Sequence, residues 1–174
     1  MRIIAGEKKG HRIAAPKGLT TRPTSDFVRE TAFNLIGPVD GASVLDLFAG
    51  SGALGLEALS RGAARATFIE SDRQACRTIN ANLDKLKLNA TVLCQDAGRA
   101  LAAERNSYDL VLADPPYDFD AADLARIAPH LRRVLASDGL LVYQTGARVE
   151  PEIEGLRIRT SRKYGSARLT LFEP

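Results

Sequence analysis

The sequence predicts an α/β protein with a doubly wound, mostly parallel, Rossmann-like sheet of about seven strands. Strand-like and helix-like patterns alternate from residue 42 onward. The strand-like runs are continuous apolar stretches, which is typical of strands that helices cover on both faces. The chain has 174 residues, about the length of one domain, and is 45% hydrophobic, so it can bury a core.

Residues 1–37 are expected to form a basic β-hairpin followed by a helix. Two short β-like runs, 2–5 and 12–15, flank the turn-prone residues 6–10. A helix over 24–36 is predicted by N-cap candidates (Thr24, Ser25, Asp26) and by the Gly37-Pro38 stop. Its expected apolar face consists of Phe27, Val28, Thr31, Ala32, Leu35 and Ile36. We therefore divide the chain into an extension, 1–37, and a main domain, 38–174.

The main domain is expected to alternate strands with helices and to end in an antiparallel pair. Strands are predicted at 43–48, 66–70, 91–94, 108–113 and 139–144. Helices are predicted at 53–61, 72–87, 97–104 and 120–135. The final strands, 156–160 and 167–172, are predicted to pair around Tyr164-Gly165.

Composition excludes several classes of protein. No stretch approaches the roughly 18 apolar residues of a membrane span, and residues 1–6 lack the apolar core of a signal peptide. The two cysteines (Cys76, Cys94) and two histidines (His11, His130) are too scattered for a disulfide framework or a zinc site. We therefore expect a cytoplasmic protein without a metal ion or a membrane partner, with a monomer favoured.

The net charge of +3 is unevenly distributed along the chain. Residues 1–25 carry +5 and residues 155–174 carry +4, whereas residues 26–154 carry −6. Two basic ends around an acidic centre favour a rim that binds a polyanion such as nucleic acid. Because charged stretches are often only solvated surface, charge alone leaves both interpretations open.

A glycine-rich loop joins the first predicted strand of the main domain to the helix after it. Gly50, Gly52 and Gly55 form the pattern G-x-G-x-x-G, which lets a backbone turn sharply and approach a nucleotide cofactor. Glu70 closes the next strand, where a carboxylate can accept hydrogen bonds from both ribose hydroxyls. The loop and Glu70 predict an adenosine-containing cofactor, and NAD(P) remains open at this point.

Asp46 favours S-adenosyl-L-methionine over NAD(P). It lies among apolar residues just before the glycine loop, where it can orient loop amides or meet a cationic ligand. A carboxylate there is poorly placed beside a diphosphate, whereas S-adenosylmethionine carries an amino group and a sulfonium and has no phosphate. Asp96 and Ala97, after the third strand, are candidates to contact the adenine.

The strongest motif is Asp114-Pro115-Pro116-Tyr117, at the end of a predicted strand. Ligands of open α/β sheets bind at the carboxyl ends of the strands, so this turn faces the same crevice as the glycine loop. Asp114 and the Pro115 carbonyl could accept both hydrogens of an amino group and so direct its lone pair at an electrophile. Asp114 could then take the proton, and Tyr117 could stack on a base swung out of its helix.

These segments together resemble the RsmD-type methyltransferases of small-subunit ribosomal RNA. The resemblance runs almost end to end and includes Arg2–Gly6, Arg22–Thr31, Leu45–Ala63, Asp114–Tyr117 and Lys163–Gly165. It implies methyl transfer from S-adenosylmethionine to N2 of a guanine in 16S rRNA. It places Phe48 with Gly50, Gly52, Glu70 and Asp96 in the cofactor motifs, and it implies that Arg22–Glu30, with Arg29, covers the cofactor and meets RNA.

The expected partner is 16S rRNA, within the 30S subunit or an assembly intermediate. We expect the basic residues of the extension to contact RNA, namely Arg2, Lys8, Lys9, Arg12, Arg22 and Arg29. Three alternatives stay open: an adenine-N6 DNA methyltransferase, a ribosome assembly factor with a non-catalytic cofactor site, and an NAD(P) dehydrogenase.

Overall fold

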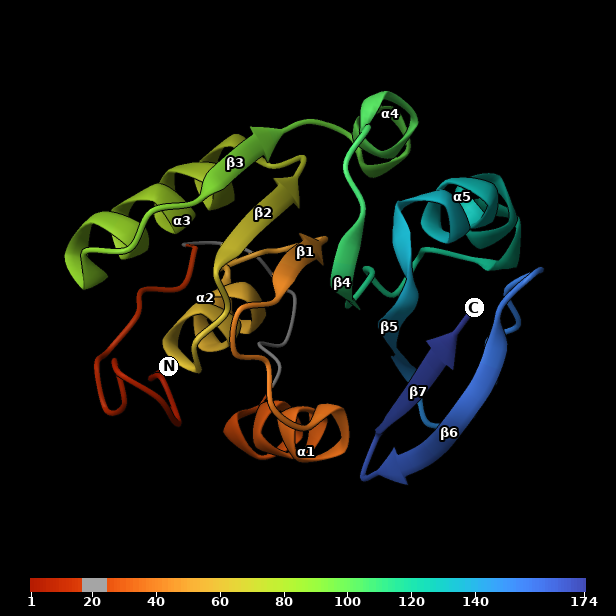
Figure 1. Ribbon diagram of the computed structural model, residues 1–174, viewed down its shortest axis with the longest axis horizontal. Helices are drawn as coiled ribbons and strands as arrows, with labels where there is room; N and C mark the ends of the chain where they lie inside the picture. The colour runs from red at the N-terminus through yellow and green to blue at the C-terminus, as the bar shows by residue number, and fades with distance from the viewer. Residues whose placement is uncertain (17–24) are drawn as a thin grey trace.

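The computed structural model, which describes residues 1–16 and 25–174, contains a seven-stranded mixed sheet between two layers of helices (Figure 1). The strand order is β3-β2-β1-β4-β5-β7-β6. The strands β1 to β5 pair in parallel, whereas β7 pairs antiparallel with both β5 and β6. The predicted fold class is confirmed, including the antiparallel final pair.

Most elements begin and end within one or two residues of their predicted bounds. The strands are β1 (Ser43–Leu47), β2 (Arg65–Glu70), β3 (Thr91–Cys94), β4 (Tyr108–Ala113), β5 (Leu135–Gly146), β6 (Arg157–Tyr164) and β7 (Ala167–Glu173). The helices are α1 (Asp26–Ile36), α2 (Ala53–Ser60), α3 (Arg73–Leu86), α4 (Ala97–Ala103) and α5 (Ala121–Val134). The two larger differences are β5, which begins directly after α5, and β6, which continues to Tyr164.

Two hydrophobic clusters hold the helices against the sheet. The first includes Phe33 of α1, Leu56 of α2 and Ile79 of α3, and the second includes Leu101 of α4 and Leu131 of α5. Buried apolar side chains therefore lie on both faces of the sheet, as the continuous apolar strands predicted. Within the described residues, no helix is long and apolar enough to cross a membrane.

The predicted N-terminal hairpin is only partly correct. In place of two strands, residues 1–16 form one antiparallel bridge, between Arg2 and Arg12. The segment is instead bound to α2, because the Glu57 carboxylate accepts hydrogen bonds from the backbone N–H groups of Ile4 (2.8 Å) and Ala5 (2.9 Å). A domain boundary at residue 37 stays a prediction, although Ile3 lies in the same hydrophobic cluster as α2 and α3.

Helix α1 has a different buried face from the predicted one. Its ends agree with the prediction, since Ser25 caps the Val28 N–H and Gly37 ends the helix at φ 87°. Phe27, however, is 63% exposed, and Arg29 is fully buried in its place. The buried guanidinium donates through Nη2 to the carbonyl of Arg2 at 2.6 Å and to the Asp26 carboxylate at 2.9 Å, and it lies 3.7 Å from the Glu57 carboxylate. Among the described residues its Nε and Nη1 atoms have no hydrogen-bond partner.

Candidate active site

The glycine loop and the Asp114 turn lie side by side at the point where the strand order reverses. Strands β1 and β4 are neighbours in the middle of the sheet, and Leu47 at the end of β1 pairs with Ala113 at the end of β4. Phe48 and Asp114 therefore leave the sheet next to each other. In open α/β sheets this switch point is where ligands bind.

The glycine loop adopts a backbone that requires glycine. Gly50 and Gly52 have φ values of 55° and 78°, in the left-handed region that favours glycine. None of the described residues comes within 4 Å of a Cβ built on Gly50, so this part of the loop faces open space. A Cβ on Gly55 would lie 2.3 Å from the Phe68 ring, so Gly55 serves the packing of α2 on β2.

Glu70 connects the glycine loop to the end of β2. Its Oε2 accepts a hydrogen bond from the Gly50 N–H at 2.7 Å, and its Oε1 accepts one from the Asp72 N–H at 2.8 Å. Each carboxylate oxygen has a further lone pair for a ligand hydroxyl. The arrangement is compatible with the predicted ribose contact, which stays a prediction.

Asp46 is buried beneath the loop and orients it. Its Oδ2 accepts a hydrogen bond from the Gly55 N–H at 2.8 Å, in the first turn of α2. Burial raises the pKa of Asp46 well above its ordinary value, the Gly55 bond opposes this, and the charges of Asp114 and Glu70 raise the pKa further. Three carboxyl groups thus share one region, which favours a cationic ligand and disfavours a diphosphate.

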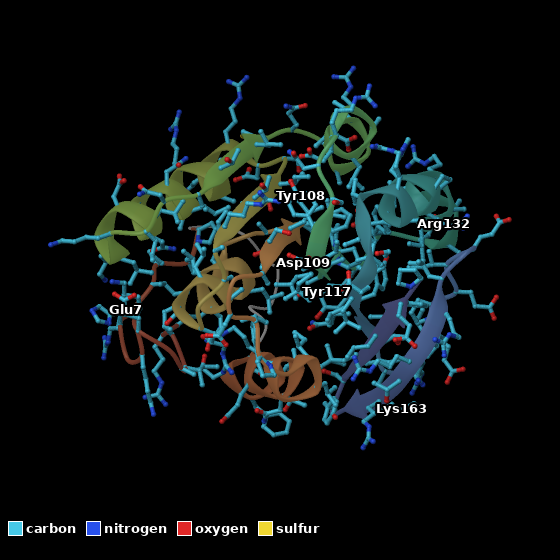
Figure 2. All side chains as sticks on the ribbon, in the orientation of Figure 1. Glu7, Tyr108, Asp109, Tyr117, Arg132 and Lys163 are labelled. Atoms are coloured by element: carbon cyan, nitrogen blue, oxygen red, sulfur yellow. The ribbon has the colours of Figure 1, made fainter. Side chains whose placement is uncertain are left out.

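The Asp114 turn is open to solvent at its far end. Asp114 and Pro115 are half-buried, whereas Pro116 is exposed and Tyr117 is 83% exposed. Figure 2 shows Tyr117 near the lower end of β4, in the middle of the molecule. The Pro116 carbonyl accepts a hydrogen bond from the Phe119 N–H at 3.0 Å, which folds the turn back toward α5. The turn therefore presents an aromatic ring for a base to meet.

Two aromatic residues near the motifs, Phe119 and Tyr143, were not identified from the sequence, whereas Phe48 was predicted to lie in the cofactor site. Phe48 has a φ of 64°, which is unusual for a bulky residue, and its ring packs edge-on against Phe119 with 5.0 Å between ring centroids. This contact joins the cofactor loop to the Asp114 turn. Tyr143 pairs with Ala113 in the sheet, and burial together with the Asp114 charge raises the pKa of its hydroxyl, which keeps it protonated.

Asn82 is a further residue that sequence reasoning missed. This buried side chain on α3 donates to the carbonyls of Ala14 (3.0 Å) and Ser51 (3.2 Å) and accepts from the Ala14 N–H (2.8 Å). It therefore fastens the N-terminal extension to the glycine loop. A signal was present, because an asparagine beside Ile79 and Leu83 interrupts the buried stripe of an amphipathic helix.

Asp96 and Ala97 lie at the start of α4, after β3. The exposed Asp96 caps the helix by accepting from the Arg99 N–H at 3.0 Å, and Ala97 is buried. Both residues follow the carboxyl end of β3, which is separated from β1 by β2, so they lie at the same end of the parallel strands as Glu70. Their contact with an adenine stays a prediction.

The predicted RNA-binding residues divide into four groups. Arg2, Lys9 and Arg12 are exposed, whereas Lys8 is mostly covered and forms a 2.7 Å ion pair with Glu7. Arg22 lies outside the described residues. The prediction for Arg29 is wrong, because its fully buried side chain is enclosed by α1, α2 and the N-terminal segment and presents no surface to RNA.

Comparisons with known proteins show the family to which the chain belongs. The pattern of the family described as "Conserved hypothetical protein 95" matches residues 1–173. "Putative rRNA methyltransferase YlbH" of Bacillus subtilis is 40% identical over 99% of this chain and 98% of its own length. "Ribosomal RNA small subunit methyltransferase D" of Escherichia coli K12 is 48% identical over 67% of this chain and 60% of its own length.

A solved structure confirms the fold independently. "Putative methyltransferase yhhF" from Escherichia coli superposes with a TM-score of 0.86 at 36% identity, over 99% of this chain and 96% of that chain. The resemblance to RsmD-type proteins is confirmed, and the chain belongs to the family described as conserved hypothetical protein 95.

Proposed function

We propose that the protein transfers a methyl group from S-adenosyl-L-methionine to the exocyclic N2 of a guanine in 16S ribosomal RNA. The observation that carries this proposal is the group of three carboxyls, Asp46, Glu70 and Asp114, at the β1–β4 switch point. The matched relatives, whose names describe rRNA and small-subunit rRNA methyltransferases, support the substrate class.

The residues present fit this cofactor better than a dinucleotide. Negative charge at this site attracts a ligand that carries a sulfonium and an ammonium group and repels a pyrophosphate, which argues against an NAD(P) dehydrogenase. Glu70 would bind the ribose, and Asp96 and the Ala97 N–H would bind the adenine. The open space beside the Gly50 backbone would let the ligand approach. When bound, S-adenosylmethionine supplies an electrophilic methyl group.

The Asp114 turn would position the amino group of the base. The Asp114 carboxylate and the Pro115 carbonyl accept its two hydrogens, which directs the nitrogen lone pair away from the turn. Asp114 then holds the proton that the nitrogen releases. Catalysis by positioning contributes up to roughly 7–11 kcal/mol, so the turn needs no strong base. Tyr117 would stack on the extruded base, as its exposure allows.

The exposed cations of the N-terminal extension would contact the RNA backbone. Arg2, Lys9 and Arg12 are exposed on a segment that Asn82 connects to the glycine loop. Each phosphate contact contributes about 0.7–0.9 to the slope of log affinity against log salt. Because few residues are available to read a sequence, the substrate is expected to be a folded particle recognised by shape, such as the 30S subunit or an assembly intermediate.

Methylation of unmodified 30S subunits tests the proposal. The protein is incubated with methyl-labelled S-adenosylmethionine, and the RNA is digested and analysed by mass spectrometry of its nucleosides. We expect the label in N2-methylguanosine. Label in another nucleoside would contradict the guanine assignment. Label in duplex DNA but not in RNA would favour an adenine-N6 DNA methyltransferase, and cofactor binding without transfer to any nucleic acid would favour an assembly factor.

A further inference from the structure

A second aromatic surface lies on the catalytic edge of the sheet, away from Tyr117. Strand β6 runs in the same direction as β4 and β5, because it is antiparallel to β7, which is antiparallel to β5. Its last residues therefore reach the edge at which Asp114 leaves β4. With strands about 4.8 Å apart, the end of β6 lies roughly 14 Å across the sheet from β4.

The side chains at this end of β6 combine aromatic rings with cations. We call Phe27, Arg162, Lys163 and Tyr164 the β6 rim. Phe27 of α1 packs edge-on against Tyr164, with 6.3 Å between ring centroids, yet 63% of Phe27 remains exposed. Tyr164 is partly buried against the hydrophobic core, so it supports the Phe27 ring from one side. An exposed ring held in this way offers a flat apolar face at little entropic cost.

The cations of the β6 rim are available to an anion. Arg162 and Lys163 are exposed, and within the described residues neither forms an ion pair. Lys163 lies opposite Arg168 in the antiparallel pair, and the buried Arg168 guanidinium is already paired with Glu150 at 2.9 Å. Figure 2 shows Lys163 at the lower end of the hairpin, beside α1.

Helix α1 connects the β6 rim to the catalytic turn. Ala32, about one and a half turns after Phe27, lines a small cavity together with Ala113, Gln144 and Leu169. Ala113 is the residue before Asp114, so α1 lies against the strands that end at the active site. A strand of RNA that delivers a base to Asp114 can therefore continue along the same edge to Phe27.

We infer that the β6 rim binds single-stranded RNA that flanks the target nucleotide. A flanking base stacks on Phe27 while Arg162 and Lys163 contact the adjoining phosphates, a combination typical of single-strand recognition. The inference rests on the proposed function for the identity of the nucleic acid. It adds a positioning surface distinct from the Asp114 turn and from the exposed cations Arg2, Lys9 and Arg12.

Binding of a fluorescein-labelled, mixed-sequence RNA dodecamer, measured by anisotropy, tests the inference without requiring methyl transfer. Phe27→Leu keeps an apolar side chain but loses the ring, and we expect its Kd to rise about tenfold. Phe27→Tyr should bind within about twofold of the unmodified protein. Because Phe27 is exposed, both variants should keep the melting temperature. Equal binding by the Leu and unmodified proteins, or no measurable binding by the unmodified protein, would overturn the inference.

A matched pair on β6 tests the charge contribution. Lys163→Ala is expected to lower the salt slope of RNA binding by about 0.7, whereas Arg159→Ala, an exposed cation of the same strand farther from the edge, should leave it unchanged. Equal effects of the two substitutions would contradict a localised site. If Phe27 and Lys163 affect RNA binding but no RNA is methylated, the proposed function fails while the binding surface stands.

Discussion

The two loops at the centre of the sheet differ in how firmly the protein holds them. The glycine loop is bound from two sides, since Gly50 donates to Glu70 and Gly55 donates to the buried Asp46. The Asp114 turn instead ends in the exposed Pro116 and Tyr117. The glycine loop is therefore organised before any ligand binds. The Asp114 turn instead presents exposed groups to a binding partner.

This difference indicates that the two loops are suited to two different ligands. A small cofactor is bound best by a rigid backbone, because little entropy is lost on binding. A base that must leave a folded RNA needs an accessible surface, because the whole nucleotide has to enter. Substitutions in the glycine loop should therefore change cofactor affinity, and substitutions in the Asp114 turn should change turnover or RNA affinity.

The largest effect is expected from Asp114→Ala. Loss of the carboxylate removes both the acceptor that orients the amino group and the group that takes its proton, so turnover should fall about 10²- to 10³-fold. The Kd for S-adenosylmethionine, measured by calorimetry, should change far less. Near-normal turnover in the labelled-methyl assay would show that Asp114 has no catalytic role.

Glu70→Ala should weaken cofactor binding about 10- to 100-fold. The substitution removes a charged acceptor for the ribose and releases the Gly50 N–H, and hydrogen bonds to charged groups contribute about 1.5–3 kcal/mol. Turnover at saturating cofactor should change much less than affinity. Asp72→Ala is a suitable control, because Asp72 also neighbours the site but serves as the N-cap of α3. Equal losses of affinity in the two variants would contradict a specific role for Glu70.

Tyr117→Ala should raise the KM for RNA about tenfold, since base stacking contributes about 1–3 kcal/mol. The melting temperature should not change, because the side chain is 83% exposed. Tyr117→Phe keeps the ring and should restore the KM. If the Phe variant is as impaired as the Ala variant, the hydroxyl and not the ring carries the effect.

The smallest effect is expected from Asp46→Asn, in the pH dependence of stability. The folded protein holds the Asp46 carboxyl at a raised pKa, so it binds the proton more tightly than the unfolded chain does. The stability that this proton contributes is present below about pH 4 and is lost as the pH rises through the folded pKa. Asparagine keeps an oxygen for the Gly55 N–H and carries no charge.

Melting curves of both proteins between pH 4 and pH 8 check this prediction. The variant should gain stability relative to the unmodified protein as the pH rises, with about 2–4 °C for each kcal/mol. Parallel curves would show that the folded protein and the unfolded chain bind this proton equally, which would contradict a raised pKa for Asp46.

The motifs could be located from the sequence because each depends on local backbone chemistry. Gly50 and Gly52 take backbone angles that other residues avoid, and Pro115-Pro116 restricts the chain after β4. The alternation of apolar runs with amphipathic helices likewise indicated the sheet and its helical layers. Such signals lie within about a dozen residues of each other, so a single sequence contains them.

Partners far apart in the chain could not be predicted in this way. The burial of Arg29 depends on Glu57, and the anchoring role of Asn82 depends on Ala14 and Ser51. The exposure of Phe27 has the same origin. Arg29 is buried on α1, whereas Phe27, which was predicted to lie on the buried face, is exposed. Each of these contacts joins segments separated by tens of residues, and no local pattern encodes it.

The sequence by itself determined the fold class, the order of the elements and the two loops of the site, because periodicity and backbone restriction are local properties. Only the tertiary structure decided which charges are buried and which aromatic rings face solvent. It brought Asp46, Glu70 and Asp114 into one region and placed Phe27 beside Tyr164. The physical reason is that burial and electrostatic coupling depend on distances in space, which the pairing of β1 with β4 and the packing of α1 create.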